Sequence, residues 1–266
     1  MNAVYNYRLV ALSVAIAICA AYAALDLAGR VTASDRRLRA VWLFGGASAM
    51  GFGIWAMHYL GMLALIMSVP MFYHVPTVLL SLLAAITAAA VALYTVSRSH
   101  MTAKDSVFGS LAMGGAIAAM HFIGMAAMRL QAVVRYRLDL VLLSLFLAVA
   151  ISWVGLWLTF QVRDDRGNSR RKLLNALVMG SAIPVMHYTG MASATFSPSN
   201  HPPNLAHAMS ISSLGTTAIA VGCFVVLIFV SGTAFVHRRL ESQKVLMRGY
   251  RGVKPSSAIW RKPFQK

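Results

Sequence analysis

Acidic residues are scarce in this chain: Asp and Glu together number 7 among 266 residues, against 24 Lys and Arg. Charged residues of both signs make up only 12% of the chain, whereas hydrophobic residues make up 59%. This composition excludes an ordinary soluble domain and is typical of a protein that crosses a membrane several times. The shortage of carboxylates also disfavours sites for Ca²⁺ or Mg²⁺, which take oxygen ligands.

Cysteine is nearly absent as well. The two cysteines, Cys19 and Cys223, lie far apart in the sequence and have no paired spacing. A disulfide framework and a CxxC metal site are therefore disfavoured. The chain also lacks paired carboxylates, a recognisable nucleophile and a nucleotide-binding glycine loop. We do not expect an enzyme, and redox catalysis by a bound metal is the catalytic alternative that stays open.

Long apolar segments, by contrast, are abundant. A helix that spans a bilayer needs about 20 predominantly apolar residues, and it satisfies its own backbone hydrogen bonds inside lipid. Seven segments meet this length: 8–28, 40–67, 76–97, 106–128, 138–161, 173–196 and 211–236. The sequence predicts an all-α membrane protein with seven transmembrane helices, which form one domain over 1–236, followed by a basic cytoplasmic tail over 237–266.

The placement of the basic residues predicts the orientation of these helices. If the amino terminus is outside and the carboxyl terminus is cytoplasmic, 20 of the 24 Lys and Arg residues fall on the cytoplasmic side, and only Arg8, Arg129, Arg135 and Arg137 fall outside. This asymmetry follows the positive-inside rule. The net charge of +17 is therefore explained by topology and by attraction to anionic lipid headgroups, and no nucleic acid partner is expected. A cleavable signal over the first segment is the less favoured alternative, suggested by residues 21–23.

A histidine-containing phrase occurs three times, at residues 57–62, 120–125 and 186–191. A Met-Gly pair begins seven residues before each phrase, which gives the common pattern M-G-x5-M-H-(Y/F)-x-G-M. The pattern appears once in every second apolar segment, at intervals of 63 and 66 residues between the histidines. We therefore expect three repeated two-helix units and a closing helix.

Helical geometry brings the key side chains of each phrase to one face. The histidine and the second methionine are four residues apart, and the methionine of the Met-Gly pair lies two turns from the histidine on the same face. Each motif-bearing helix thus carries a stripe of thioethers that includes one imidazole. The three phrases are also expected at similar depth near the outer face of the membrane, so that three imidazoles and at least six sulfurs meet in one layer.

Imidazole and thioether ligands favour copper in the Cu(I) state. Zinc is disfavoured because it does not usually take methionine. Haem is the main rival, because His and Met both serve as its axial ligands. A buried structural histidine and a methionine stripe that only fills the core are the plainer interpretations. Recurrence in three copies with the same phase and depth favours a site over both.

The phrase at 186–189 reads MHYT, and the chain closely resembles the MHYT family of bacterial integral-membrane sensor domains over about residues 7–240. The resemblance includes the three phrases and the opening stretches 9–13 and 24–30. It implies seven transmembrane helices, a bacterial inner-membrane location, copper binding, and sensing of oxygen, nitric oxide or carbon monoxide. Departures from the motif are mild: Leu60 and Ile123 replace threonine, and Phe122 replaces tyrosine.

Carried over by motif position, the resemblance implies a set of nine metal ligands. They are Met57, His58, Met62, Met120, His121, Met125, Met186, His187 and Met191. Further candidate ligands, from the Met-Gly pairs, are Met50, Met113 and Met179.

Many members of this family carry an enzymatic output domain after the last helix, whereas this chain ends about 30 residues beyond it. We therefore expect signalling through an unidentified cytoplasmic partner. A copper acquisition, transfer or transport protein is the second hypothesis, and a haem-binding membrane protein is the third. The concentration of ligands at one depth favours sensing or storage over transport.

Overall fold

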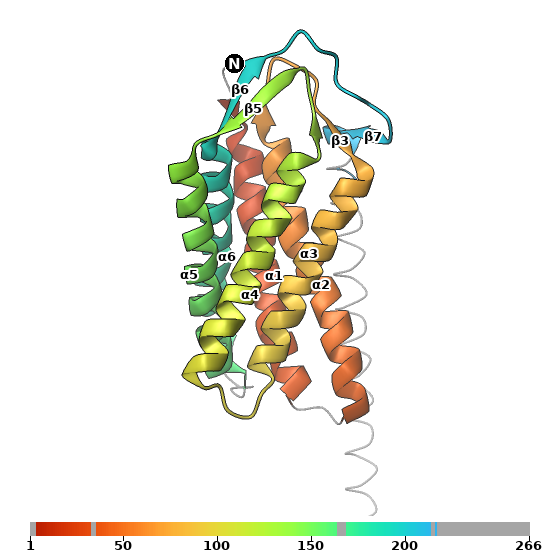
Figure 1. Ribbon diagram of the computed structural model, residues 1–266. Helices are drawn as coiled ribbons and strands as arrows, with labels where there is room; N and C mark the ends of the chain where they lie inside the picture. The colour runs from red at the N-terminus through yellow and green to blue at the C-terminus, as the bar shows by residue number, and fades with distance from the viewer. Residues whose placement is uncertain (1–3, 33–35, 164–168, 214–215, 217–266) are drawn as a thin grey trace, which may run out of the picture. The chain divides into compact units, whose positions relative to one another are not determined.

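The structure, a computed structural model, describes residues 4–32, 36–163, 169–213 and 216. This part of the chain holds six long α-helices, which run roughly parallel and antiparallel to one another as a bundle (Figure 1). They are α1 (Tyr7–Thr32), α2 (Arg36–Leu63), α3 (Val75–Val96), α4 (Ala103–Ala126), α5 (Leu138–Val162) and α6 (Ser169–Ser193). The first six expected helices are thus present, and the seventh, at 211–236, lies almost wholly outside the described residues.

Five of these helices are long and apolar enough to cross a membrane: α1, α2 from Arg39, α3, α4 and α5. Helix α6 is not among them, and its sequence includes Asn175, Pro184 and His187 within its less charged part. It nevertheless packs against α1 and α5 along the same bundle. The described part of the chain therefore has the character of a multi-pass membrane protein.

The six helices form a closed ring. Each helix packs against its neighbours in the chain, and α6 packs against α1. The motif-bearing helices α2, α4 and α6 also contact one another, as do α1, α3 and α5. The three two-helix units are consequently arranged about an approximate three-fold axis, with the motif-bearing helices meeting at its centre.

Three equivalent glycines permit the closest helix contacts in this ring. A Cβ atom at Gly51 would lie 2.5 Å from the Cα of Ile86 in α3, and the equivalent distance is 2.7 Å between Gly114 and Val149 in α5. At Gly180 the hypothetical Cβ would lie 2.3 Å from the Cα of Ile18 in α1. Each Met-Gly pair thus places one helix directly against the backbone of the next odd-numbered helix, and the Gly180 contact closes the ring.

Short strands cap one end of the bundle, and the sequence analysis did not predict them (Figure 1). They form three antiparallel sheets, in the orders β1-β2, β4-β3-β7 and β5-β6. Their bounds are β1 (Val4–Tyr5), β2 (Leu65–Ile66), β3 (Phe72–His74), β4 (Met128–Arg129), β5 (Ala132–Tyr136), β6 (Ala194–Pro198) and β7 (Ala208–Ser210). The expectation of a purely helical fold was therefore wrong at this end.

The strands also begin close to three predicted helix ends. The segments predicted at about 40–67, 106–128 and 173–196 end slightly earlier, within the precision of a sequence-based boundary: α2, α4 and α6 end at Leu63, Ala126 and Ser193. Residues that follow pair as strands. Hydrophobicity cannot distinguish a short strand from the last turn of an apolar helix, because both bury the same side chains.

At the opposite end, basic side chains join two other helices to the end of α3. Arg163, at the end of α5, is buried and donates hydrogen bonds to the carbonyl oxygens of Val96, Arg98 and Ser99 at the end of α3. Arg39 of α2 donates to the carbonyl of Ser97 at 2.9 Å. These guanidinium groups bind carbonyl oxygens that have no partner within helix α3 itself.

Candidate metal centre

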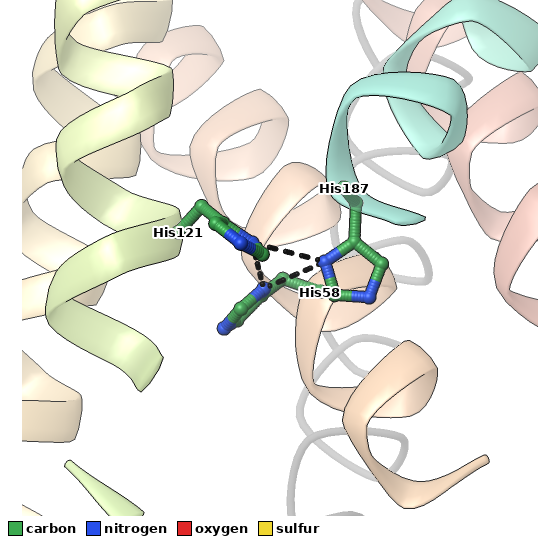
Figure 2. Close-up of side chains that lie close together, drawn as sticks. All are labelled: His58, His121 and His187. Carbon is green, nitrogen blue, oxygen red and sulfur yellow. Dashed lines mark hydrogen bonds between the residues drawn. The ribbon is translucent and has the colours of Figure 1, made fainter. Parts of the chain in front are cut away.

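Three histidines from three different helices meet at the centre of the bundle. His58 of α2, His121 of α4 and His187 of α6, which we call the His triad, point toward one another (Figure 2). Their exposed fractions are 0%, 0% and 1%. The sequence places each histidine at the same motif position, and the three-fold arrangement of the units turns this repetition in sequence into convergence in space. The predicted meeting of the three imidazoles is confirmed.

The Nδ1 atoms form the inner face of the His triad. The Nδ1 atom of His187 lies 3.1 Å from that of His58 and 3.1 Å from that of His121, and the third side of the triangle is 3.3 Å. The centre of such a triangle is about 1.8 Å from each nitrogen, close to the roughly 2.0 Å length of a metal–imidazole bond. These three nitrogens could therefore hold one small metal ion together.

The Nε2 atoms point outward and have no hydrogen-bond partner among the described residues. Each one lies against the motif glycine of another helix. A Cβ atom at Gly124 would lie 2.3 Å from Nε2 of His58, and the corresponding distance is 2.4 Å both for Gly190 with His121 and for Gly61 with His187. The three contacts run cyclically around the axis. Each glycine leaves room for the Nε2 side of an imidazole, so that its Nδ1 atom faces the centre. A side chain at any of these glycines would collide with an imidazole.

The shape of the His triad fits a bound cation. Each Nδ1 atom either carries a proton or offers a lone pair, and never both, so hydrogen bonds cannot satisfy all three sides of the triangle at once. A metal ion at the centre accepts all three lone pairs at once. The neutral imidazoles then carry their protons on Nε2, which faces glycine.

The methionines fall into two groups by depth. The six motif methionines, which are Met57, Met62, Met120, Met125, Met186 and Met191, are all buried. The other three, Met50, Met113 and Met179, together line two cavities whose walls do not include the His triad. We call these three residues the Met layer. Eight residues separate each of them from its histidine, or about 12 Å along a helix, so the Met layer cannot bind the same ion as the His triad.

The aromatic residue that follows each histidine packs edge-on against it. The ring centroids of His58 and Tyr59 are 4.9 Å apart, and those of His187 and Tyr188 are 4.8 Å apart. The Tyr188 hydroxyl lies 3.0 Å from the Oγ atom of Ser13 in α1. These contacts hold the aromatic rings, and through them the imidazoles, against the odd-numbered helices.

A serine on each odd-numbered helix supports this packing, and the sequence analysis did not single it out. Ser13, Ser81 and Ser144 are all 0% exposed. Each hydroxyl donates a hydrogen bond of 2.7 Å to the carbonyl oxygen three residues earlier. Ser81 also accepts a hydrogen bond from the indole of Trp55 at 3.1 Å and lies 3.2 Å from the Tyr59 hydroxyl. The sequence signal that could have identified these residues is the recurrence of a serine at the equivalent position of each odd-numbered apolar segment.

The histidines outside the helices are not part of the His triad. His74 bonds through Nδ1 to the Thr77 hydroxyl at 2.8 Å, and its ring lies 6.4 Å from that of His207. Nearby, burial raises the pKa of the Tyr73 hydroxyl well above its ordinary value. Within the described residues, the His triad is the only group of three or more His, Cys, Asp or Glu side chains close enough to hold one metal ion.

Comparison with known families supports the repeat described above. The family model described as "Bacterial signalling protein N terminal repeat", MHYT, matches residues 51–109, 114–170 and 180–248. Each matched repeat contains one histidine of the His triad. No solved structure matches this chain.

Several curated proteins are similar to this chain. The bifunctional diguanylate cyclase/cyclic di-GMP phosphodiesterase MucR of Pseudomonas aeruginosa is 47% identical over 72% of this chain, which corresponds to 28% of MucR. The signaling protein YkoW of Bacillus subtilis is 37% identical over 76% of the chain and 26% of its own length. The cyclic di-GMP phosphodiesterase NbdA of P. aeruginosa is 36% identical over 74% of the chain and 25% of its own length. This chain thus spans about a quarter of the curated relatives that it matches.

Proposed function

Because this chain belongs to the MHYT family of bacterial signalling proteins, we propose that it is a membrane sensor that holds copper, as Cu(I), at the His triad. The metal responds to oxygen, nitric oxide or carbon monoxide, or to its own change of redox state. The change in coordination shifts α2, α4 and α6, and a cytoplasmic partner receives this shift. In this proposal the chain is a sensor and not an enzyme, and it resides in the bacterial inner membrane.

The single observation that carries the proposal is the triangle of Nδ1 atoms. Three buried imidazoles from three helices approach to 3.1–3.3 Å, which is the spacing of ligands around one small cation. A ligand change at a point shared by three helices affects all three of them at once. This is the property that a sensor needs if binding is to change the relative position of its helices.

The donor set supports copper over other metals. Imidazole nitrogen and thioether sulfur are neutral ligands that suit a soft, univalent ion, and the six motif methionines are buried next to or one turn from the histidines in sequence. A univalent ion held by neutral ligands leaves only one net charge within the apolar bundle. We propose Met57, Met62, Met120, Met125, Met186 and Met191 as the sulfur donors available to this site.

Haem fits the His triad poorly. The three imidazoles contact one another, and the Nδ1 separations of 3.1–3.3 Å leave no room for a porphyrin ring between any two of them. A haem would require the imidazoles to separate and their helices to move apart. An absorption spectrum of the purified protein with a Soret band would contradict this argument.

Copper transfer or transport is favoured by one observation, the Met layer. Met50, Met113 and Met179 place thioethers about 12 Å from the His triad, at a second depth in the same bundle. Copper uptake into vesicles that contain the protein tests this alternative. Flux above that of empty vesicles, lost when the three histidines are replaced, would favour transport over sensing.

The relatives support a signalling output outside the described helices. MucR and NbdA are named as enzymes of cyclic di-GMP synthesis and breakdown, and this chain matches about a quarter of each. We propose that the partner of the membrane helices is an activity of this class. Loss of the copper-dependent output when the His triad is replaced would connect the two.

Metal analysis of the purified protein is the direct test of the metal site. We expect copper at close to one ion per chain in the unmodified protein and a loss of at least about tenfold in H58N/H121N/H187N, because three ligands are removed together. The matched control is H74N/H201N/H207N, which replaces three histidines outside the bundle and should keep its copper. Full copper retention in the first variant would overturn the site assignment.

A further inference from the structure

A small apolar cavity lies in the bundle beside the Met layer. Its volume is about 20 Å³, taken as the space open to the centre of a water-sized molecule. Its walls come from α1, α2, α4, α5 and α6, and they include the three methionines of the Met layer and the side chains of Ile54, Ile117 and Ile183. These three isoleucines occupy the same place in each repeat, four residues before the histidine. We call this space the sub-triad cavity.

The sub-triad cavity is large enough for one small molecule but poorly suited to water. A cavity of at least about 10–15 Å³ on this measure can hold a water molecule, which needs two to four polar partners. The side chains that line the sub-triad cavity are apolar with the exception of Ser152. Apolar cavities of this kind stay dry and take up apolar molecules instead.

Ser152 supplies a second, independent indication of a ligand. It is 0% exposed, it lines the sub-triad cavity, and its hydroxyl has no hydrogen-bond partner among the described residues. The equivalent positions in the other two units are Ala21 and Ala89. A buried hydroxyl without a partner is destabilising unless a guest in the cavity accepts its hydrogen bond. An apolar molecule that carries one weak acceptor atom satisfies both conditions.

The position of the sub-triad cavity connects it with the His triad. The isoleucines in its wall are one helical turn, or about 6 Å, from the histidines of their helices. Ala20 of α1 and Ile151 of α5, also in its wall, are only partly buried. Small apolar molecules dissolve in the hydrocarbon of a membrane, and these two are the wall residues that are not fully buried.

We propose that the sub-triad cavity is a docking site for one diatomic gas molecule, which waits there before it reaches the His triad. The identity of the guest as a gas rests on the proposed sensing function, whereas the existence of the docking site rests on the cavity alone. Oxygen, nitric oxide and carbon monoxide share the required chemistry, since each has two heavy atoms, is weakly polar and accepts at most a weak hydrogen bond. The Ser152 hydroxyl donates to the guest.

The thioethers of the Met layer serve here as soft apolar walls and not as a second metal site. Met179 already accepts a hydrogen bond at Sδ from the Thr159 hydroxyl, at 3.8 Å. The same three methionines also line a second cavity of about 10 Å³ on their other side. We therefore assign the three side chains to the walls of these cavities.

Xenon binding to the metal-free protein tests the docking site without reference to copper. The protein is labelled with ¹³C at the methionine methyl groups, placed in nanodiscs and titrated with dissolved xenon. We expect saturable shifts of the Met50, Met113 and Met179 signals, and only a linear, solvent-like drift for Met209, which is exposed. In S152L, where the added side chain fills the cavity, the saturable shifts should fall at least about fivefold. In S152A they should persist within about twofold, because removal of the hydroxyl oxygen leaves the cavity open and apolar.

The alternatives give distinct results. If S152L does not fold, I117A takes its place, and the enlarged cavity should strengthen xenon binding. Equal shifts at all methionines, or unchanged saturable shifts in S152L, would overturn the proposal. Titration of H58N/H121N/H187N with Ag(I) gives a further test. Saturable shifts of the same three methionine methyl signals would also overturn the proposal, because they would make the Met layer a metal site. If the unmodified protein binds xenon in this way but binds no copper, the proposed function is contradicted and the docking site is not.

Discussion

The Nε2 atom of His58 lies directly against Gly124 of the neighbouring helix α4: a Cβ atom at that glycine would be only 2.3 Å from the nitrogen. The same relationship links His121 with Gly190 and His187 with Gly61. The glycine of each motif therefore positions the histidine of another repeat and not its own. The histidine of one copy of the motif contacts the glycine of another copy. Both residues therefore recur in every copy.

Replacement of Gly124 by alanine is predicted to disturb the His triad. The added methyl group must displace the His58 imidazole, which moves Nδ1 away from the other two ligands. We expect G124A to lose about 1–3 kcal/mol of stability and at least about tenfold in copper affinity. Gly115 of the same helix has nothing within 4 Å of its hypothetical Cβ, so G115A is the matched control. Thermal unfolding and copper titration of both variants check the prediction, and equal behaviour would contradict it.

Replacement of Ser81 by alanine should destabilise the bundle more than the same change at Ser144. Ser81 binds the Trp55 indole and the Tyr59 hydroxyl, both of which become unpaired in S81A. An unpaired buried donor costs about 1–3 kcal/mol. At the equivalent Ser144, the motif aromatic is Phe122, which has no hydroxyl, and the serine bonds only to the Val141 carbonyl. A comparison of unfolding temperatures tests this difference, and a larger loss in S144A than in S81A would refute the role given to Ser81.

Copper binding should stabilise the protein through the His triad. A ligand that binds only the folded state stabilises it by about 4 kcal/mol when its free concentration is 1,000 times the dissociation constant. Buffered Cu(I) is therefore expected to raise the unfolding temperature of the unmodified protein, and a chelator should reverse the rise. H58N/H121N/H187N should show no shift, whereas H74N/H201N/H207N should behave like the unmodified protein. A shift of equal size in the first variant would place the copper elsewhere.

Replacement of Arg163 by methionine should loosen the end of the bundle opposite the strands. Its guanidinium donates to the Val96, Arg98 and Ser99 carbonyls, and removal leaves these buried or partly buried acceptors without that donor. We expect a loss of about 2–4 kcal/mol, with little recovery in R163K because an ammonium cannot reproduce the planar fork. The control is R137A: Arg137 pairs with Asp139, and both side chains are 61% exposed, so its replacement should change the stability far less. Full rescue by lysine would contradict the geometric argument.

The helices were largely predictable, and their ends were not. Apolar length identified α1 to α6, because a long uninterrupted apolar segment in a charge-poor chain has few stable alternatives to a membrane helix. The residues after Leu63, Ala126 and Ser193 leave the helices and form strands. Their conformation depends on partners far away in the chain, such as the pairing of Tyr5 with Leu65, which local hydrophobicity does not encode.

The site was predictable in part for a similar reason. Repetition of the motif indicated that His58, His121 and His187 share one layer, and the structure brings them together. The sequence could not show that Met50, Met113 and Met179 line separate cavities, because residues on one helical face can lie at different depths along the bundle axis. Ser13, Ser81 and Ser144 escaped notice because a single serine in an apolar helix is common.

The sequence by itself determined the helical segments, the membrane character and the triple repeat, since composition and helical periodicity are local properties of the chain. The tertiary structure alone decided which nitrogen of each histidine faces the others, which glycine lies behind each imidazole, and that α6 closes the ring against α1 at Gly180. These features arise from contacts between helices that are distant in sequence. Close packing between these helices sets the geometry of the contacts, and no pattern along the sequence encodes it.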